Sequence, residues 1–558
     1  MDHLLKFLIV ISSTQLILVN CHLNLTIIHN NDIHSRYLPT TINGEDCEAE
    51  NDVRCFGGIG KIVTKVRELR KQIPNLLFLN GGDTFTGTLY YSLFKWKLAA
   101  DMVLRMRFDA MSFGNHEFDD GVAGLAPYLE ATHEKVPTLA CNVDVSNEPK
   151  MRHLVNKSKV FTVGGQKIAV IGYVTPDTAK ISFPGHTLKF TDEAECIEKE
   201  VEKLKKENVK IFIAVGHSGF DEDKAIARKV PDLDVIVGGH TNTFLYNGKP
   251  PSKEVASDVY PAVVEHKDGR RTLVVQAYAY GKYLGFLNVI IDEKGEVVKF
   301  HGQPILLDHT VPDDPKIREF MLKKSGQLKA KYDSPIGKTL VLLDGDCRKH
   351  ECNMGNFVTD MMLTSVISIK PKPHNGWAEY PCSFISGGFL RASIDDLKNN
   401  SDVTSRDVIR VVPFENKISG IILTGKVLKE VFEHSVHRFS DTLTEYEGEF
   451  LQVSGFKVIY DLSKPVGQRV VRLMIRCGEC RVPMYEILDE SKTYKVLTSD
   501  FMAGGGDLYL MLIKVEHEPF NKVIQWEMIN YFKNHSPVFA GLEKRSKFVK
   551  QKQLVKDA

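Results

Sequence analysis

In five segments of the sequence, a short apolar run is followed directly by side chains that commonly bind metal ions. In chain order they read LTIIHNNDIH, LLFLNGGD, FDAMSFGNHEFD, IFIAVGHSG and VIVGGHTN. The apolar runs have the length of buried strands, and LTII, IFIAV and VIV are also rich in β-branched residues. One polar residue after a strand is typical of an ordinary loop, but five such segments in succession are hard to obtain by chance. Ligands bind at the carboxyl ends of strands in open α/β sheets, so we expect one site that collects Asp32, His34, Asp83, Asn115, His217, His240 and Asn242.

This set of donors indicates two divalent cations. Histidine nitrogen together with Asp and Asn oxygen suits zinc or manganese better than the all-oxygen ligand set of calcium. We predict zinc first, with manganese, calcium or magnesium as alternatives. Two cations about 3.5–4 Å apart can bind a hydroxide between them and hold the oxygens of a phosphoryl group. The pattern therefore predicts a metal-dependent phosphohydrolase.

His116 and Asp119 lie in the third segment and form a candidate catalytic pair. The His116 imidazole could stabilise charge that develops on the phosphoryl oxygens or on the leaving group. Asp119, three residues further on, would orient that imidazole and favour its charged form. Without metal ligands nearby, the same pair would indicate only a structural hydrogen bond.

The elements that must position these residues alternate between strands and helices from Leu25 to about Thr310. Strands are predicted at 25–28, 76–79, 168–173, 211–215 and 235–237, and amphipathic helices at 61–73 and 193–207. This alternation predicts a layered α/β domain. A connecting helix is predicted over 314–332, with Pro315 near its start. The following chain, to about Phe532, mixes strands and helices and predicts an α+β domain.

The length and charge of the chain fit this organisation. A chain of 558 residues is too long for one hydrophobic core. The formal net charge of +1 gives no overall field that would attract nucleic acid or an anionic membrane. We predict a signal peptide at 1–21, a catalytic domain at 22–312, a linker helix at 313–335, a substrate-binding domain at 336–540 and a polar tail at 541–558.

The first residues suggest secretion. An uncharged run from Phe7 to Val19 follows Lys6, and it is too short to span a bilayer but fits the apolar region of a signal peptide. A buried N-terminal strand is the alternative. The C-terminus is basic and polar, so we expect no lipid anchor and a soluble extracellular product. Sequons that would fit secretion occur at Asn24, Asn156 and Asn399.

The cysteines fit an oxidising compartment. Close spacings suggest three disulfides: Cys47–Cys55, Cys347–Cys352 and Cys477–Cys480. Half of a zinc site is the alternative for the last pair, but the sequence has no second CxxC. Cys141, Cys196 and Cys382 are left without an assignment, and at least one of them should be free or intermolecular.

Taken together, the five segments resemble the successive motifs of the 5′-nucleotidase family of metallophosphoesterases. The resemblance continues through RKHECNMGN, VVPFENK, FEHSVHRFS, EFLQVSGFKVIYDLS and FMAGGGD, in family order and over nearly all of the chain after the apolar N-terminus. Secreted members of the family include the salivary apyrases and 5′-nucleotidases of blood-feeding arthropods. The resemblance implies a four-layer α/β/β/α catalytic domain, joined by a helix to an α+β nucleotide-binding domain. It also implies closure between the domains during catalysis, with the 314–332 helix as a candidate hinge.

The resemblance also implies roles for individual residues. Asp32, His34, Asp83 and Asn242 would surround one metal, and Asp83 would bridge to a second metal bound by Asn115, His217 and His240. His116 and Asp119 match the catalytic pair of the family. The positions that match the nucleotide contacts are Arg348, Ser386, Arg391, Phe414, Phe501 and Asp507. The two Phe rings would hold the base between them, and Asp507 would accept hydrogen bonds from the ribose.

One segment departs from the family pattern. Where the pattern reads Asn-Gly-Gly-Gly-Ile-Arg, this chain has Ser386-Gly-Gly-Phe389-Leu-Arg391. Serine lacks the paired donor and acceptor of an amide, and Phe389 is bulky, so the contacts to the base should differ. Thr359 also stands where the pattern has a cysteine, which leaves Cys382 without its family partner.

These observations predict an apyrase-like enzyme that hydrolyses extracellular ATP and ADP, with AMP as a further substrate. Such an enzyme would oppose ADP-driven platelet aggregation if it were salivary. A 5′-nucleotidase that produces adenosine from AMP is the first alternative. A non-catalytic protein that binds nucleotides or a cell surface is the second. In each case the expected ligand is a nucleoside tri-, di- or monophosphate, and nucleic acid is not expected as a partner.

Overall fold

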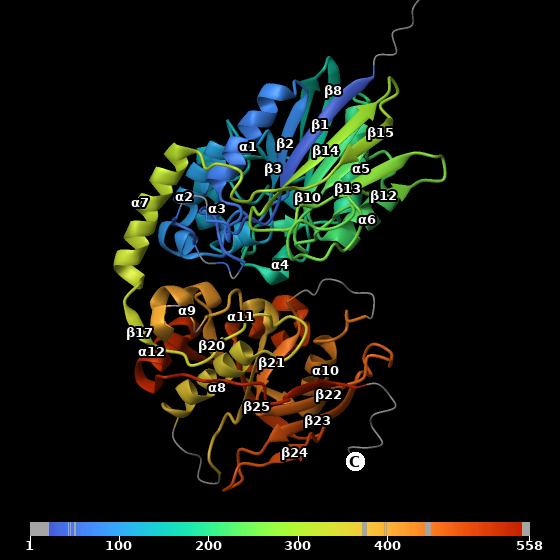
Figure 1. The fold of residues 1–558 in the computed structure, drawn as a ribbon. Helices are drawn as coiled ribbons and strands as arrows, with labels where there is room; N and C mark the ends of the chain where they lie inside the picture. Colours follow the sequence, from blue (N-terminus) through green and yellow to red (C-terminus); the bar gives the residue numbers. More distant parts are fainter. Residues whose placement is uncertain are drawn as a thin grey trace, which may run out of the picture.

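A computed structural model describes residues 22–549, except 43, 45, 50–51, 371–375, 396, 398 and 441–447. The predicted signal peptide, 1–21, lies outside the described residues. The chain folds into two domains, one above the other in Figure 1, and the long helix α7 runs down one side from the first domain to the second. Among the described helices, none is long and apolar enough to cross a membrane.

The N-terminal domain is built on two sheets. The strand order in the first is β15 (Val297–Gly302), β14 (Tyr283–Ile291), β1 (Leu23–Asn30), β2 (Leu76–Asn80), β3 (Ala110–Ser112), β4 (Thr138–Leu139) and β6 (Val155–Asn156), with β16 (Ile305–Leu306) also paired to β14. The order in the second is β12 (Ala262–Glu265), β13 (Arg271–Val275), β11 (Val235–Val237), β10 (Ile211–His217), β8 (Gln166–Val174) and β7 (Ser158–Val163). In the first sheet β1, β2, β3, β4 and β6 run parallel, and in the second β8, β10, β11 and β13 do.

Helices cover the outer faces of both sheets, which confirms the predicted α/β/β/α layers. One buried cluster joins the sheets and includes Ile27 of β1 and Ile213 of β10. A second cluster joins the first sheet to α1 (Ile59–Gln72), α2 (Leu89–Met106) and α3 (Gly121–Thr132). The helices α5 (Glu193–Lys205) and α6 (Phe220–Lys229) pack on the other sheet (Figure 1). All four layers bury apolar side chains, so the carboxyl ends of the parallel strands are where polar groups can gather.

The connecting helix forms where the sequence predicts it. The helix α7 spans Pro315–Tyr332, and the Asp314 side chain caps it by accepting hydrogen bonds from the backbone N–H groups of Lys316 and Ile317. Proline at the first helical position is favoured because its missing N–H would have no partner there. Asp314 also forms an ion pair with Arg67 of α1, at 2.8 Å. The start of α7 is thereby fixed to the N-terminal domain.

The C-terminal domain is α+β. Its main sheet has the order β21 (Leu451–Ser454), β18 (Cys382–Ser386), β25 (Thr493–Ser499), β20 (Lys417–Thr424) and β26 (Glu516–Val523). A second sheet has the order β24 (Tyr485–Ile487), β23 (Val470–Arg476), β22 (Phe456–Tyr460) and β27 (Ser546–Phe548), and β17 (Pro335–Lys338) pairs with β19 (Asp402–Thr404). The helices are α8 (Asn353–Ile367), α9 (Ser405–Val411), α10 (Gly425–His434), α11 (Asp500–Ala503) and α12 (Ile524–His535).

Residues 541–549 are not a tail, which corrects the boundary expected from the sequence. The strand β27 pairs in parallel with β22, and the Phe548 ring lies 5.5 Å from the Tyr460 ring and 5.8 Å from that of Phe450. Arg545 is 5% exposed and pairs with Asp360 of α8 at 2.7 Å. One aromatic ring and the ion pair of a buried arginine therefore hold a segment whose composition is typical of a solvated end.

The three predicted disulfides are confirmed. Bonds join Cys47 to Cys55, Cys347 to Cys352, and Cys477 to Cys480. The cysteines left unassigned, Cys141, Cys196 and Cys382, are all free.

Candidate active site

The seven predicted metal-binding side chains come together where the two sheets of the N-terminal domain meet. Five of them are almost fully buried: Asp32, His34, Asp83 and Asn115, which lie in loops of the first sheet, and His217, which belongs to β10 of the second. His240 and Asn242 follow β11 and are partly exposed. His217 is the last residue of β10, and the others follow the ends of β1, β2, β3 and β11. The carboxyl ends of parallel strands in the two sheets thus bring the seven side chains together at one site.

Asp83 lies at the centre of the group. Its Oδ2 atom is 3.0 Å from His217 Nε2 and 3.6 Å from His34 Nε2. Asp32 Oδ1 is 3.5 Å from the same His34 nitrogen and 3.8 Å from His217 Nε2. On the other side, His240 Nδ1 is 3.0 Å from Asn115 Oδ1. A carboxylate between two histidines is the arrangement expected of a ligand shared by two cations.

The donor atoms fit metal ions. The Nδ1–H groups of His34 and His217 can donate to the carbonyls of Thr86 and Gly81, at 2.8 and 2.6 Å, which turns both Nε2 atoms towards Asp83. Metal-binding histidines usually have such a partner on their second nitrogen. Three buried atoms in this group lack a hydrogen-bond partner within the described part of the chain: Asp32 Oδ1, His217 Nε2 and Asn242 Oδ1. Buried polar atoms without a partner are costly, and two bound cations would give all three atoms a partner.

The backbone at the site is strained. Five of the seven residues have positive φ: Asp32, His34, Asp83, His240 and Asn242, with values between 48° and 80°. Non-glycine residues adopt this conformation infrequently, and each instance costs of the order of 1–3 kcal/mol. The surrounding fold therefore holds these loops in unfavourable conformations that bring the side chains together.

Glu117 fixes the loops around Asp83, and sequence reasoning missed it. Its buried carboxylate accepts hydrogen bonds from the backbone N–H groups of Gly114, Asp83, Thr84 and Phe85, at 2.6–3.2 Å, and from the Thr84 hydroxyl at 2.8 Å. Burial raises the pKa of Glu117 and so does Asp83, whereas the bonds from Gly114 and Thr84 lower it. The only signal in the sequence is its position between His116 and Phe118.

His116 and Asp119 form the predicted pair. His116 Nδ1 is 2.7 Å from Asp119 Oδ2, and Asp119 Oδ1 accepts a hydrogen bond from Ser182 at 2.8 Å. Burial would lower the pKa of His116, but Asp119 and then Asp83 outweigh it and raise the pKa above its ordinary value. The two carboxylates thus favour the charged imidazole, whereas the guanidinium group of Arg391 opposes it. Ser182, which orients Asp119, carried no recognisable signal in the sequence.

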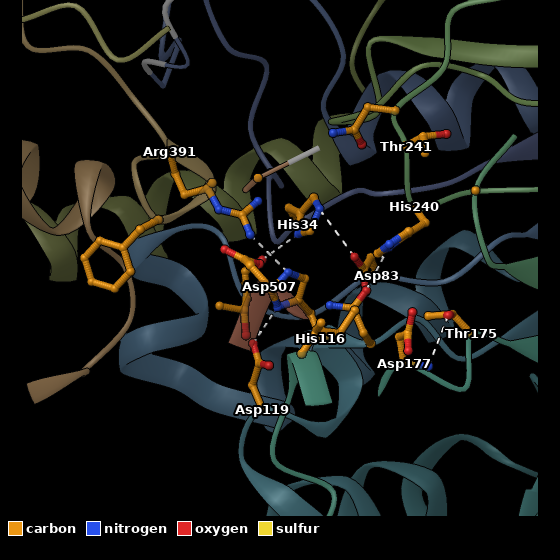
Figure 2. Close-up of a pocket in the computed structure, with 18 of the residues that line it drawn as sticks. His34, Asp83, His116, Asp119, Thr175, Asp177, His240, Thr241, Arg391 and Asp507 are labelled. Atoms are coloured by element: carbon orange, nitrogen blue, oxygen red, sulfur yellow. Dashed lines mark hydrogen bonds and ion pairs between the residues drawn. The ribbon is translucent and has the colours of Figure 1, made fainter. Parts of the chain in front are cut away.

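Two residues of the C-terminal domain also contact His116. Arg391 Nη2 lies 3.1 Å from His116 Nε2, and the Phe414 ring stacks on the His116 ring at 5.9 Å. Figure 2 shows His34, Asp83 and His116 between Arg391 and Asp507 on one side and His240 and Thr241 on the other. One cavity of about 1120 Å³ extends across both domains. Its lining includes His34, Asp83, Asn115, His116, Asp119, His240, Asn242, Arg348, Phe389, Arg391, Phe414, Phe501 and Asp507.

Ser386 lies apart from that cavity. It is the last residue of β18, is 1% exposed, and is not one of the described residues that line the cavity. Phe389 does line it, and its ring packs on Phe414 at 6.0 Å. Phe183, which the sequence did not indicate, lies 6.5 Å from the Phe501 ring and contributes an aromatic surface from the catalytic domain.

Comparisons with known proteins identify both domains. Residues 25–244 match the family model for calcineurin-like phosphoesterases, whose fold implies a site for two metal ions. Residues 335–514 match the model for the C-terminal domain of 5′-nucleotidases. The fold and the group of side chains around Asp83 thus define a metal-dependent hydrolase of the phosphoesterase class.

Similarity over nearly the whole chain identifies the family within this class. A snake venom 5′-nucleotidase from Gloydius brevicauda is 42% identical over 532 residues, which cover 93% of this chain and 88% of that protein. Protein 5NUC of Lutzomyia longipalpis is 38% identical and covers 97% of each chain. The crystal structure of a 5′-nucleotidase precursor from Thermus thermophilus matches with a TM-score of 0.83 and 33% identity, over 94% of this chain and 99% of that one. The chain belongs to the 5′-nucleotidase family.

Proposed function

We propose that this protein hydrolyses the phosphate ester of nucleoside 5′-monophosphates, releasing a nucleoside and inorganic phosphate. The observation that carries this proposal is the single cavity that joins the group around Asp83 to Phe414, Phe501 and Asp507 of the other domain. One end suits a phosphoryl group and the other suits a flat base with a hydroxylated sugar. The relatives named as 5′-nucleotidases support the same substrate class.

The residues at the phosphate end would act by positioning and by charge. Arg391 and Arg348 present guanidinium groups, which match the geometry of phosphoryl oxygens. His116, with Asp119 behind it, would donate a hydrogen bond from Nε2 to an oxygen whose charge grows as the ester bond breaks. Ser182 holds Asp119, so the imidazole keeps one orientation while the substrate enters.

The residues at the nucleoside end would bind without strong preference for one base. Phe414 and Phe501 offer aromatic faces, and every base has a face that can stack on them. The Asp507 carboxylate can accept hydrogen bonds from ribose hydroxyls. His434 Nε2 lies 2.9 Å from the backbone carbonyl of Asp507, which has a positive φ of 50°, and holds that residue in place.

Two metal ions complete the proposal. Asp32, His34, Asp83 and Asn242 would hold one, and Asp83, Asn115, His217 and His240 would hold the other. Zinc suits the mixed nitrogen and oxygen donors best, with manganese next. When bound, the ions supply a nucleophile from water at neutral pH and neutralise phosphoryl charge.

Hydrolysis of ATP and ADP is the second candidate function. Phe389 packs against Phe414 where the family pattern has glycine, so the base site differs in shape from that pattern. A base displaced by this ring would leave a longer phosphate chain between it and the metal-binding group. If the protein is secreted, as the apolar run at 7–19 suggests, its substrates would be extracellular, and removal of ADP would suppress platelet activation.

A panel of substrates separates the two candidates. The protein is depleted of metal with a chelator, zinc or manganese is added back, and phosphate release from AMP, ADP and ATP is compared. Fast release from AMP, abolished by chelation, is the result expected. Fast release from ATP and ADP with little from AMP would replace the first proposal by the second. The variant His116→Ala controls for a contaminating phosphatase, because activity that survives in it does not come from this site.

A further inference from the structure

Two free cysteines from distant parts of the sequence lie next to each other in the N-terminal domain. Cys141 follows β4 of the first sheet, and Cys196 lies in α5, which covers the second sheet. Cys141 is 5% exposed and belongs to the buried cluster that joins the two sheets. Cys196 is half-buried and packs against the same cluster. The two thiols are hydrogen-bonding partners, so each sulfur is within reach of the other.

Hydrogen bonds also place the two segments side by side. The Cys141 N–H donates to the carbonyl of Gly172 in β8 at 2.8 Å, and the Gly172 N–H donates to the carbonyl immediately before Ser158 at 3.1 Å. The Ser158 hydroxyl donates to Glu200 Oε1 at 2.7 Å. Glu200 lies four residues after Cys196 on α5, and residues at this spacing share one face of a helix. These hydrogen bonds connect the backbone at Cys141 to the face of α5 that carries Cys196.

The two sulfurs have different surroundings. Burial raises the pKa of Cys141, and the contact with Cys196 raises it further. The pKa of Cys196 is lowered, because its hydrogen bond with Cys141 and the ammonium group of Lys157 outweigh its partial burial. The thiolate is the form that attacks a disulfide. Cys196 is therefore the sulfur that reacts first, and Cys141 is placed to react second.

A shared metal ion does not suit this pair. Structural zinc sites use four protein ligands, and within the described ranges of the chain neither cysteine belongs to a group of three or more metal-binding side chains. The same chain forms three disulfides, which is typical of an oxidising compartment. Oxidation of the two thiols is the chemistry that this setting favours.

We propose that Cys141 and Cys196 form an oxidation site, which reacts with a small-molecule disulfide such as glutathione disulfide and closes to a fourth disulfide. The Cys196 sulfur attacks one sulfur of the oxidant, whose S–S bond breaks; one glutathione leaves as a thiol, and a mixed disulfide forms on Cys196. The Cys141 sulfur then attacks the Cys196 sulfur and releases the second glutathione as a thiol. The two protons and two electrons that the protein thiols lose are those that glutathione disulfide gains in becoming two thiols.

The bond would fix the position of α5. It would join the loop after β4 to this helix, and so connect the first sheet to the layer that covers the second. The first residue of α5, Glu193, lines the catalytic cavity and accepts a hydrogen bond from Ser218 at 2.8 Å. The bond would therefore support one wall of the cavity from a distance, without changing the side chains around Asp83.

Peptide mapping tests the bond directly. The full-length protein is incubated with glutathione disulfide, unfolded in the presence of iodoacetamide to block every remaining thiol, digested, and analysed by mass spectrometry without reduction. A pair of peptides that links Cys141 to Cys196 and separates on reduction is the result expected. Cys382, a fully buried free cysteine of the other domain, should carry the iodoacetamide label in the same sample. Iodoacetamide on both Cys141 and Cys196 would overturn the proposal.

Two single variants test the order of attack. In Cys141→Ser the second step is removed, so Cys196 should retain the mass of one glutathione. The matched variant Cys196→Ser should leave Cys141 unmodified, because that thiol is buried. A far-UV circular dichroism spectrum equal to that of the wild type shows that each variant is folded. The absence of glutathione from Cys196 in the first variant, or its presence on Cys141 in the second, would refute the assigned order.

Discussion

Replacing Glu117 by glutamine should weaken both the catalytic domain and its metal site. One carboxylate oxygen of Glu117 accepts from Thr84 N, Thr84 Oγ and Phe85 N, and the other accepts from Asp83 N and Gly114 N. Glutamine has one acceptor oxygen, which would face the three donors. Its NH₂ group would then face the N–H groups of Asp83 and Gly114.

Two buried donors left without an acceptor, at about 1–3 kcal/mol each, give a loss of about 2–6 kcal/mol in the free energy of unfolding. Denaturant unfolding followed by fluorescence measures this loss, with Glu134→Gln on the surface as the matched control. Since Asp83 N is one of the affected groups, bound metal per chain, measured by elemental analysis, should fall as well. If Glu117→Gln unfolded within about 0.5 kcal/mol of the control, the hydrogen bonds would not have the strength assigned to them.

Three further outcomes are expected. Asp119→Asn should lower kcat by about 10²-fold with little change in KM, because it disturbs the orientation and charge of His116 rather than substrate binding; an unchanged kcat would contradict this role. Phe501→Leu should raise KM for AMP by about tenfold, since one stacking contact is worth about 1–3 kcal/mol, but it should spare a substrate without a base, such as p-nitrophenyl phosphate. Asp83→Asn should bind less metal at any added zinc concentration, as isothermal titration would show, and retention of two ions per chain would disprove its shared position.

The sequence predicted which side chains gather around Asp83, because strand ends are visible locally. The residues His217 and His240 each follow a short β-branched run, and the topology of a layered α/β fold brings such ends together. Apolar runs of strand length alternate with amphipathic helices along the first 310 residues, so the layered α/β fold could also be predicted from the sequence. The strained backbone at Asp32 and Asp83 did not, because positive φ at non-glycine residues has no signature in composition.

Contacts between distant segments were not predictable in the same way. Ser182 and Phe183 occupy a loop of ordinary composition after α4 (Thr178–Ile181), and their roles depend on Asp119 and Phe501, which lie far away in the sequence. Ser386 is a case in which order along the chain and position in the fold differ. It matches a substrate-binding position by order along the chain, but at the end of a fully buried strand its hydroxyl has no access to the cavity. Sequence order fixes the position of a residue but not the direction of its side chain.

The surroundings of His116 are complete only where the two domains meet. Asp119 and Ser182 orient His116 from within the first domain, whereas Arg391 and Phe414 approach the same imidazole from the second. Neither domain alone therefore contains both the oriented imidazole and the guanidinium group next to it. A change that separates the domains without altering any of these residues should lower kcat while leaving metal binding intact, because the seven side chains predicted to bind metal all belong to the first domain. Metal content and turnover are thus separable properties of this fold.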